Sequence, residues 1–318
     1  MSPHPTRRSA LLRAAGLLTA ATFRPGSVLG AAERGRVSGF RAPLQEMVHR
    51  PIPSSGEEIP IIGMGTWQTF DAGDDTAARE PLRDVLRIFV ESGGRVVDAS
   101  PIYGSSEEVL GDLAAELGVQ DGLWWATKVW TEGRTEGVEQ MEESMRLLRR
   151  RRIELIQVHN LVDAATQLET LQAWKEEGRI DYIGITRSNS NAFPEVERWM
   201  DDERLDFIQI NYSLREREAE ARVLPKAQER GIAVMLNRPL GGGALFRRVE
   251  GMEIPAWARA IGISAWSQFF LKFAVSHPAV TCAIPATSNP DHMRENMGAG
   301  VGPLPDAATR RWMADTLA

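Results

Sequence analysis

The sequence predicts an α/β protein folded as a (β/α)8 TIM barrel with an N-terminal β-hairpin. From about residue 60 onward, short apolar segments rich in β-branched residues alternate with segments of helical periodicity, and eight such pairs follow one another. Strands that are almost entirely apolar are typical of a parallel sheet with both faces covered. Eight units favour a closed barrel over an open doubly wound sheet. No G-x-G-x-x-G motif follows the first strand, as an open dinucleotide-binding sheet would require.

The strand candidates are short and β-branched. In order they are IPIIGMGTW, RVVDAS, LWWATKVW, ELIQVHN, YIGITRS, DFIQINY, IAVMLNRP and VTCAIPAT. Ahead of the first, the segment MVHRPIPSSGEEIPIIG is typical of a hairpin that turns at 54–56. We expect this hairpin to cover the N-terminal mouth of the barrel.

Helical periodicity is clearest in the first half of the barrel. Apolar residues at i, i+3, i+4 and i+7 define one face of an amphipathic helix. They recur within 82–90, 109–117, 138–148 and 168–174. Gly178 is placed to end the fourth helix as a C-cap, and a short helix is expected near 306–314.

Residues 1–35 differ from the rest and form an export signal-like or disordered segment. Adjacent Arg7 and Arg8 precede a short apolar stretch over 14–23. That stretch is too short for a stable membrane span in the mature chain, and the pattern resembles a twin-arginine export signal. A disordered basic tail is the alternative. We expect a periplasmic or exported protein if the signal is used, with the twin-arginine machinery as a partner, and a cytoplasmic one otherwise.

Composition is that of an ordinary globular protein, with 43% hydrophobic residues, 25% charged residues and a net charge of −6. This mild acidity argues against nucleic-acid binding, because that function needs a basic surface. The single Cys282 excludes an intramolecular disulfide. Its apolar surroundings predict an inert buried thiol.

Four polar residues lie at the ends of three consecutive strand candidates. Asp98 ends the second strand and Tyr103 lies in the loop after it; Lys128 ends the third strand and His159 ends the fourth. Side chains at the carboxyl ends of barrel strands converge on one rim. Taken singly, each has a structural explanation, such as a turn cap or a core histidine. Together they predict a catalytic group.

The chemistry of this group is proton transfer to a carbonyl oxygen. A phenol has an ordinary pKa of about 10, and the Lys128 ammonium is expected to lower the pKa of Tyr103, with Asp98 as its counter-ion. His159 is placed to donate a hydrogen bond to the carbonyl. None of these side chains supplies two electrons, so hydride must come from an organic cofactor. The five histidines are scattered, and no metal site is expected.

The motifs VVDASPIYGSSEEVLG, WWATKVW, ELIQVHN, GRIDYIGITRS and FIQINYS resemble the successive signatures of the aldo-keto reductase family. The resemblance implies a single reductase barrel domain over 36–318. It also implies hydride transfer from NADPH to small aldehydes or ketones, with Tyr103 as the proton donor. Lys128 would be its pKa-lowering partner, Asp98 the support and His159 the orienting group.

The resemblance also marks a substrate pocket and a cofactor rim. Trp67 and Trp130 match pocket-lining aromatics, and Phe70 is expected beside them. The expected cofactor contacts are Thr186, Arg187, Gln209, Asn237, Arg238, Leu240, Gly241, Thr287, Ser288, Asn289, His292, Glu295 and Asn296. The short tail after the last of these predicts an open pocket with modest selectivity.

Several cofactor positions depart from the common family pattern. Arg187 replaces an asparagine, and Asn237 replaces an aromatic residue that stacks on the nicotinamide. Ala286 and His292 replace a lysine and an arginine near the 2′-phosphate. Losing two cations should weaken 2′-phosphate binding, because charge-assisted bonds are the stronger ones. NADPH remains the expected cofactor on resemblance, with NADH as the alternative.

Two alternatives to an enzyme remain open. A protein of the same fold could bind the nicotinamide cofactor as a regulator or scaffold without significant turnover. A periplasmic solute-binding protein is the second alternative, but it would need two lobes and a hinge. No linker is visible in the middle of the sequence.

Overall fold

The computed structural model describes residues 46–317. The export signal expected over 1–35 and the domain boundary at residue 36 lie outside the described residues. None of the described helices is both long and apolar enough to cross a membrane.

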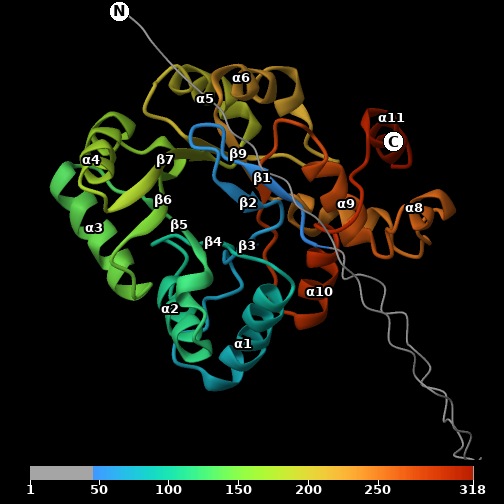
Figure 1. Ribbon diagram of the computed structural model, residues 1–318, viewed down its shortest axis with the longest axis horizontal. Helices are drawn as coiled ribbons and strands as arrows, with labels where there is room; N and C mark the ends of the chain where they lie inside the picture. Colours follow the sequence, from blue (N-terminus) through green and yellow to red (C-terminus); the bar gives the residue numbers. More distant parts are fainter. Residues whose placement is uncertain (1–45, 318) are drawn as a thin grey trace, which may run out of the picture. The chain divides into compact units, whose positions relative to one another are not determined.

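Eight parallel strands form the central sheet, and they follow one another in chain order. They are β3 (Met64–Gly65), β4 (Val96–Asp98), β5 (Trp124–Val129), β6 (Ile153–Val158), β7 (Ile180–Arg187), β8 (Phe207–Asn211), β9 (Ala233–Asn237) and β10 (Cys282–Ala283). Figure 1 shows the strands as a ring with helices around the outside. The predicted (β/α)8 barrel is confirmed.

The ring closes through the short strands β3 and β10. Ile62 bridges Ala283, and Gly65 bridges Ala286, both in parallel orientation. The backbone N–H of Gly63 donates to the carbonyl of Ala283 at 2.9 Å. A Cβ at Gly65 would lie 2.8 Å from the carbonyl oxygen of Ile284, across this seam. Glycine therefore permits the close approach of strands at this seam.

Helices cover the outside of the barrel, with at least one after each strand. They are α1 (Thr76–Glu91), α2 (Ser106–Leu117), α3 (Arg134–Leu147), α4 (Ala164–Glu176), α5 (Phe193–Trp199), α6 (Val223–Arg230), α7 (Ala244–Arg248), α8 (Ala256–Ala260), α9 (Trp266–Val275), α10 (Pro290–Gly298) and α11 (Ala307–Asp315). The four periodic segments of the sequence form α1 to α4. Gly178 follows the C-cap residue of α4 in the left-handed conformation, with φ of 72°. The short helix expected near 306–314 is α11.

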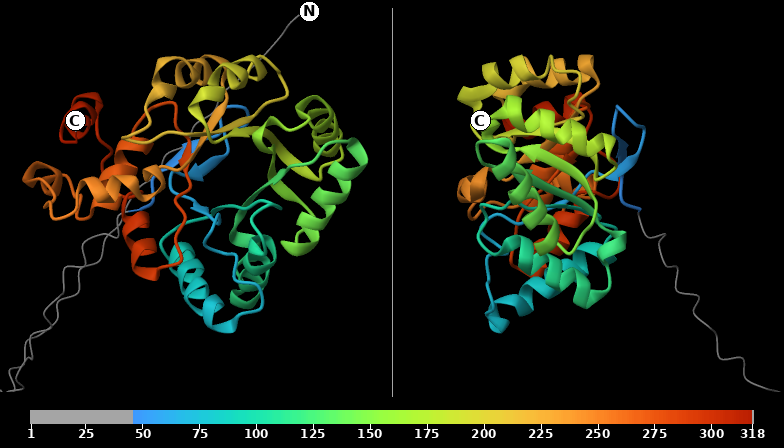
Figure 2. Two further views of the ribbon diagram at one scale, coloured as in Figure 1. Left: turned by 180° about the vertical axis from the view of Figure 1, so that it is seen from behind. Right: turned by 90° about the vertical axis from the view of Figure 1, so that its left-hand side faces the viewer.

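The predicted hairpin is formed by β1 (His49–Pro51) and β2 (Glu58–Pro60). Its Ile52 and Ile59 are fully buried in an apolar cluster inside the barrel. The other members of this cluster are Val96, Trp124, Ala126, Leu155, Tyr182, Phe207, Ala233, Met235, Cys282 and Ile284. Several of them are the first residues of their strands, so the hairpin covers the N-terminal end. The side view in Figure 2 shows it at one end of the barrel.

Cys282 belongs to this interior cluster and is fully buried. Burial raises the pKa of its thiol. The predicted burial of this cysteine is confirmed, and a raised thiol pKa is in line with the expected low reactivity.

Candidate active site

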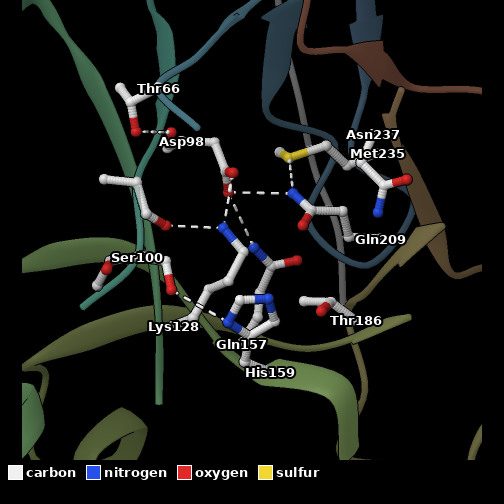
Figure 3. Close-up of polar contacts among 12 residues, drawn as sticks. Thr66, Asp98, Ser100, Lys128, Gln157, His159, Thr186, Gln209, Met235 and Asn237 are labelled. Carbon is white, nitrogen blue, oxygen red and sulfur yellow. Dashed lines mark hydrogen bonds and ion pairs between the residues drawn. The ribbon is translucent and has the colours of Figure 1, made fainter. Parts of the chain in front are cut away.

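A layer of polar side chains lies inside the barrel, next to the apolar cluster. Alternate residues of a strand share a face, and the residues two positions earlier belong to the interior cluster. The side chains of the polar layer are Asp98 of β4, Lys128 of β5, Gln157 of β6 and Gln209 of β8. Because the strands are parallel, these positions lie toward the carboxyl end of the barrel. Figure 3 shows the layer converging on Asp98.

Asp98 and Lys128 form a buried ion pair in this layer. Lys128 Nζ donates to Asp98 Oδ2 at 2.6 Å and to the carbonyl of Ala99 at 2.7 Å. Asp98 Oδ1 accepts hydrogen bonds from Gln157 Nε2 at 3.3 Å and from Gln209 Nε2 at 3.0 Å. Burial is the largest single effect and favours a neutral amine, but the charge and hydrogen bond of Asp98, together with the charges of Tyr103 and Glu107, hold the pKa of Lys128 above its ordinary value. Lys128 therefore remains a cation although it is fully buried.

Tyr103 lies beside Lys128, in the loop between β4 and α2. Lys128 Nζ is 5.2 Å from the centroid of its ring. Burial raises the pKa of Tyr103 above its ordinary value, while the Lys128 ammonium acts in the opposite direction. Lys128 therefore lowers the pKa of Tyr103 as expected, but this effect is smaller than that of burial. This corrects the expectation of an acidified phenol, because burial wins and the hydroxyl stays protonated at neutral pH.

His159 follows β6 and begins the 3-10 helix η2 (His159–Leu161). Its ring meets the Tyr103 ring edge to face, with centroids 5.8 Å apart and planes at 85°. Its Nδ1 forms a hydrogen bond with Ser100 Oγ at 3.1 Å. Burial, together with the charge of Lys128, lowers the pKa of His159 to about 3. The imidazole is therefore neutral at physiological pH.

The loop after His159 has an uncommon backbone conformation. Asn160, Leu161 and Asp163 have φ values of 54°, 59° and 46°, in the left-handed region that disfavours residues other than glycine. The Asp163 carboxylate accepts the backbone N–H of Gly133 at 2.9 Å. Strained backbone persists only where surrounding contacts hold it, and it is often found at functional sites. Here it fixes the chain immediately after a predicted catalytic residue.

Two of the three predicted pocket aromatics are exposed at the carboxyl ends of strands. Trp67 and Trp130 are 47% and 43% exposed. Phe70 is fully buried in the main hydrophobic cluster, which corrects the expectation that it lines the pocket. The reason is a turn in which the N–H of Phe70 donates to the carbonyl of Thr66, returning the chain to the core. Ile102, beside Tyr103, is 40% exposed and was not singled out from the sequence.

The predicted nicotinamide-side residues lie at the ends of β7, β8 and β9. Thr186 Oγ1 accepts the backbone N–H of Asn160 at 3.3 Å. The Arg187 guanidinium pairs with Glu195 of α5 at 2.8 Å, and Asn237 Nδ2 donates to the Arg187 carbonyl at 3.4 Å. Arg187 and Asn237 are therefore neighbours, while Gln209 reaches into the barrel toward Asp98.

The glycine-rich turn after β9 contains Arg238, Leu240 and Gly241. Arg238 has φ of 50°, and the N–H of Gly241 donates to the Arg238 carbonyl at 2.8 Å. A Cβ on Gly242 would lie 3.0 Å from the Arg238 guanidinium, so this cation lies close to the turn. A permanent cation beside glycine backbone is suited to a pyrophosphate.

The predicted adenosine-side residues gather at the start of α10. Asn289 caps this helix, and its Oδ1 accepts the backbone N–H of Asp291 at 2.8 Å. Thr287 Oγ1 accepts the backbone N–H of Asn289 at 3.1 Å. Ser288 and His292 are exposed. The N–H groups of Asp291 and His292 are already bonded to Asn289 Oδ1, so an anionic ligand here would be attracted by the positive end of the helix dipole and not by free N–H groups.

The last two predicted contacts lie further along α10. Glu295 is exposed, and its carboxylate accepts the hydroxyl of Ser267 at 2.9 Å. Asn296 is buried. All thirteen predicted cofactor residues thus lie on or after β7 to β10, the last four strands of the barrel, and Gln209 points into the barrel.

Buried polar atoms without a partner support this rim as a binding surface. Among the described residues they include three amide oxygens near the ends of β8 and β9 and on α10, namely Asn211 Oδ1, Asn237 Oδ1 and Asn296 Oδ1. A buried acceptor without a donor costs free energy. A nicotinamide carboxamide and an adenine amino group are such donors. The chemistry of these residues therefore fits a nicotinamide adenine dinucleotide, to which Asn237 and Asn296 would offer acceptors.

Three polar residues of the site were missed in the sequence. Gln157 lies two residues before His159, and Asn211 two residues after Gln209, so strand alternation alone would have found both. Ser100 lies two residues after Asp98 in the same way. In each case the missed residue lies on the same face of its strand as a predicted one.

A model of the aldo/keto reductase family matches residues 61–314 of the chain. The chain belongs to the aldo/keto reductase family. Aldo-keto reductase YhdN of Bacillus subtilis is 30% identical over 217 residues, which cover 63% of this chain and 64% of that protein. Methylglyoxal reductase YeaE of Escherichia coli is 27% identical over 260 residues, or 79% of this chain and 89% of that protein.

Solved structures agree with this assignment. An aldo-keto reductase from Klebsiella pneumoniae in complex with NADPH has a TM-score of 0.72 at 25% identity, covering 85% of this chain and 96% of that chain. A second structure from that organism, in complex with NADP and acetate, has a TM-score of 0.71 at 24% identity, covering 82% and 93%. The family and the oxidoreductase names of the relatives support an NAD(P)H-dependent reductase.

Proposed function

We propose that this protein reduces the carbonyl group of small aldehydes or ketones with NADPH, and that Tyr103 donates the proton. The observation that carries the proposal is the Tyr103 ring 5.2 Å from the buried Lys128 ammonium, which Asp98 holds at 2.6 Å. His159 lies against the same ring. A proton donor, a cation and a neutral hydrogen-bonding ring thus lie together at one end of the barrel.

Each residue has one task in this reaction. The bound cofactor supplies a hydride, which carries two electrons to the carbonyl carbon. His159 holds the carbonyl oxygen, and Tyr103 transfers its hydroxyl proton to that oxygen, so that the substrate leaves as an alcohol. Lys128 stabilises the phenolate that remains, until solvent returns a proton to it. Asp98 keeps Lys128 charged and in place.

The preference for NADPH rests on the relatives solved with NADP or NADPH and on the rim residues that fit a dinucleotide. Arg238 and the capped start of α10 supply the features that an anionic cofactor needs. Fluorescence titration with NADPH and NADH is the direct measurement, and tighter binding of NADH would contradict the cofactor assignment.

The substrate class rests on the exposed Trp67 and Trp130 and on the name of the relative methylglyoxal reductase YeaE. Exposed aromatic side chains at a rim suit a small carbonyl compound held against an apolar wall. Methylglyoxal and 4-nitrobenzaldehyde are therefore the first substrates to assay. Efficient turnover of a bulky sterol ketone, together with no turnover of methylglyoxal or 4-nitrobenzaldehyde, would contradict the proposed substrate class.

Tyr103→Phe tests the chemistry. Removing the hydroxyl removes the proton donor and leaves the ring in place, so NADPH consumption with 4-nitrobenzaldehyde should fall at least about 100-fold, within the range of a lost general acid. Tyr182→Phe is the matched control, because Tyr182 lies in the interior cluster at the N-terminal end, where its hydroxyl contacts Ser55 and Glu57. This variant should keep its activity.

The same assay separates the enzyme from a cofactor-binding regulator or scaffold of the same fold. Tight NADPH binding without turnover of any carbonyl compound would favour the regulator. Equal activity of Tyr103→Phe and the unmodified protein would also reject the proposed mechanism.

We also propose that the protein is exported after folding around its cofactor, as the twin-arginine-like segment suggests. Arg7 and Arg8 motivate this proposal. Cell fractionation, with a nucleotide assay on the exported protein, is the measurement. Full-length protein found only in the cytoplasm would contradict it.

A further inference from the structure

We propose that Ser100 is a positioning residue that fixes the tautomer of His159, so that Nε2 carries the ring hydrogen and donates it to the substrate. The role of that donor rests on the proposed carbonyl reduction. The tautomer itself is a property of the protein and can be measured without a reaction.

Ser100 is fully buried and lies two residues beyond Asp98. Its Oγ is 3.1 Å from His159 Nδ1 (Figure 3). Alternate residues of an extended segment share a face. The end of β4 therefore provides both the carboxylate that supports Lys128 and the hydroxyl that contacts His159.

The hydrogen between these two atoms can belong to either of them. His159 is neutral, so only one ring nitrogen carries a hydrogen. Either the Ser100 hydroxyl donates to Nδ1 and the hydrogen lies on Nε2, or Nδ1–H donates to Ser100 Oγ and Nε2 is left as an acceptor. Both states have the same heavy-atom geometry.

The surroundings favour donation by Ser100. Among the described residues, the Ser100 hydroxyl has no other side-chain or carbonyl partner within hydrogen-bond distance. If Nδ1 were the donor, the hydroxyl hydrogen would be buried without an acceptor, which is unfavourable. Donation from Ser100 satisfies both groups with one hydrogen bond.

The chemistry leads to the same assignment. An acceptor nitrogen would repel a carbonyl oxygen, whereas Nε2–H stabilises the negative charge that develops on that oxygen. The hydrogen bond at one ring nitrogen sets the role of the other. Ser100 therefore acts on the substrate only through His159.

The tautomer is tested by nitrogen NMR of the cofactor-free protein labelled at histidine. The chain has five histidines, and the spectrum of His159→Gln identifies the His159 signals. We expect an acceptor-type Nδ1 and a protonated Nε2 in the unmodified protein. In Ser100→Ala, which removes the donor, a mixture of tautomers is expected, and Ser100→Thr, which keeps a hydroxyl, should restore the single state.

Two spectral outcomes would overturn the proposal. One is a protonated Nδ1 in the unmodified protein. The other is a Ser100→Ala spectrum that still shows only the Nε2–H tautomer in a folded protein, as judged by circular dichroism. If Ser100→Ala does not fold, Ser100→Thr and the unmodified protein still report the tautomer. A protonated Nδ1 in either protein would reject the proposal.

Kinetics provide the second readout. Loss of one buried hydrogen bond should lower kcat/KM about three- to tenfold in Ser100→Ala, with recovery in Ser100→Thr. Ser276→Ala is the matched control. Ser276 Oγ donates to the Phe273 carbonyl at 2.9 Å, at the C-terminal end of α9, where helices reach the N-terminal end of the barrel. An absence of turnover in the unmodified protein would reject the proposed function and leave the tautomer result standing.

Discussion

At Tyr103, burial and a neighbouring cation act on the same hydroxyl in opposite directions. Burial raises the pKa of the phenol, and the Lys128 ammonium lowers it. The protonated form that results is the one a carbonyl reduction requires, because the group must begin as a proton donor. Lys128 then contributes when the phenolate forms, which is when a positive charge stabilises it most.

His159 shows the effect of burial without a counter-ion. Its pKa of about 3 predicts that the ring of the folded protein stays neutral from pH 5 to pH 8. The NMR signals of His159 should therefore not shift over this range. After unfolding in urea, the same residue should titrate near its ordinary pKa of about 6.5.

This depressed pKa also affects stability. Between about pH 6.5 and pH 3 the unfolded chain binds a proton at His159 and the folded chain does not, so its contribution to stability falls as the pH falls. A titration midpoint near 6.5 in the folded protein would show that the ring is solvated and would contradict the neutral donor.

At the scale of elements, periodicity determined most of what could be predicted. All eight strands and the first four helices were expected, because continuous apolar runs and i, i+3, i+4 spacing are local signals. The lengths of β3 and β10 were not expected. Their pairing depends on Gly63 and Gly65 meeting the segment around Ala283, and such a contact between distant segments leaves no local periodicity.

The site was predictable where chemistry and strand position coincide. Asp98, Lys128 and His159 were found because each ends a strand. Phe70 was misplaced because it was expected beside Trp67 and Trp130 in the pocket, whereas a turn buries it. The pKa of Tyr103 was misjudged because its direction depends on burial, and the sequence does not give the degree of burial.

The helix α2 contains a buried carboxyl group that the reaction does not use. Glu107 accepts hydrogen bonds from Thr127 Oγ1 and from Ser144 Oγ, the latter at 3.0 Å. Burial raises its pKa to about 7 from an ordinary value of 4.5, although both hydroxyls and Lys128 oppose this. Between these values the folded chain binds a proton that the unfolded chain releases, so stability falls as the pH rises from about 4.5 to 7.

Glu107→Gln should remove this dependence. The amide cannot ionise. From pH 5 to pH 8 the unfolding free energy of the unmodified protein should fall by roughly 2–3 kcal/mol because of Glu107, and the variant should not show this fall. Urea unfolding at both pH values measures it. Glu108→Gln, at the exposed neighbouring position of α2, is the control and should follow the unmodified protein; equal pH dependence in all three proteins would contradict a buried, protonated Glu107.

At the scale of the whole molecule, the barrel depends on its closing seam. Strands β4 to β9 pair with one another through three to five residue pairs at each step, whereas the segments of β3 and β10 meet through isolated bridges at Ile62 and Gly65. The seam also carries Trp67 at its rim end, so closure and pocket geometry are linked. Weakening the seam should therefore affect both stability and substrate binding.

Gly65→Ala tests the seam. The added Cβ would lie 2.8 Å from the carbonyl oxygen of Ile284, a backbone atom that cannot rotate away, so the strands must separate. Such overpacking should lower the unfolding free energy by about 1–3 kcal/mol, measured by urea unfolding followed by circular dichroism, and should raise KM. Gly122→Ala is the control, because no atom lies within 4 Å of a Cβ there, and it should be neutral or slightly stabilising. Equal unfolding midpoints for the two variants would show that the seam can relax, and closure would then not depend on glycine at this position.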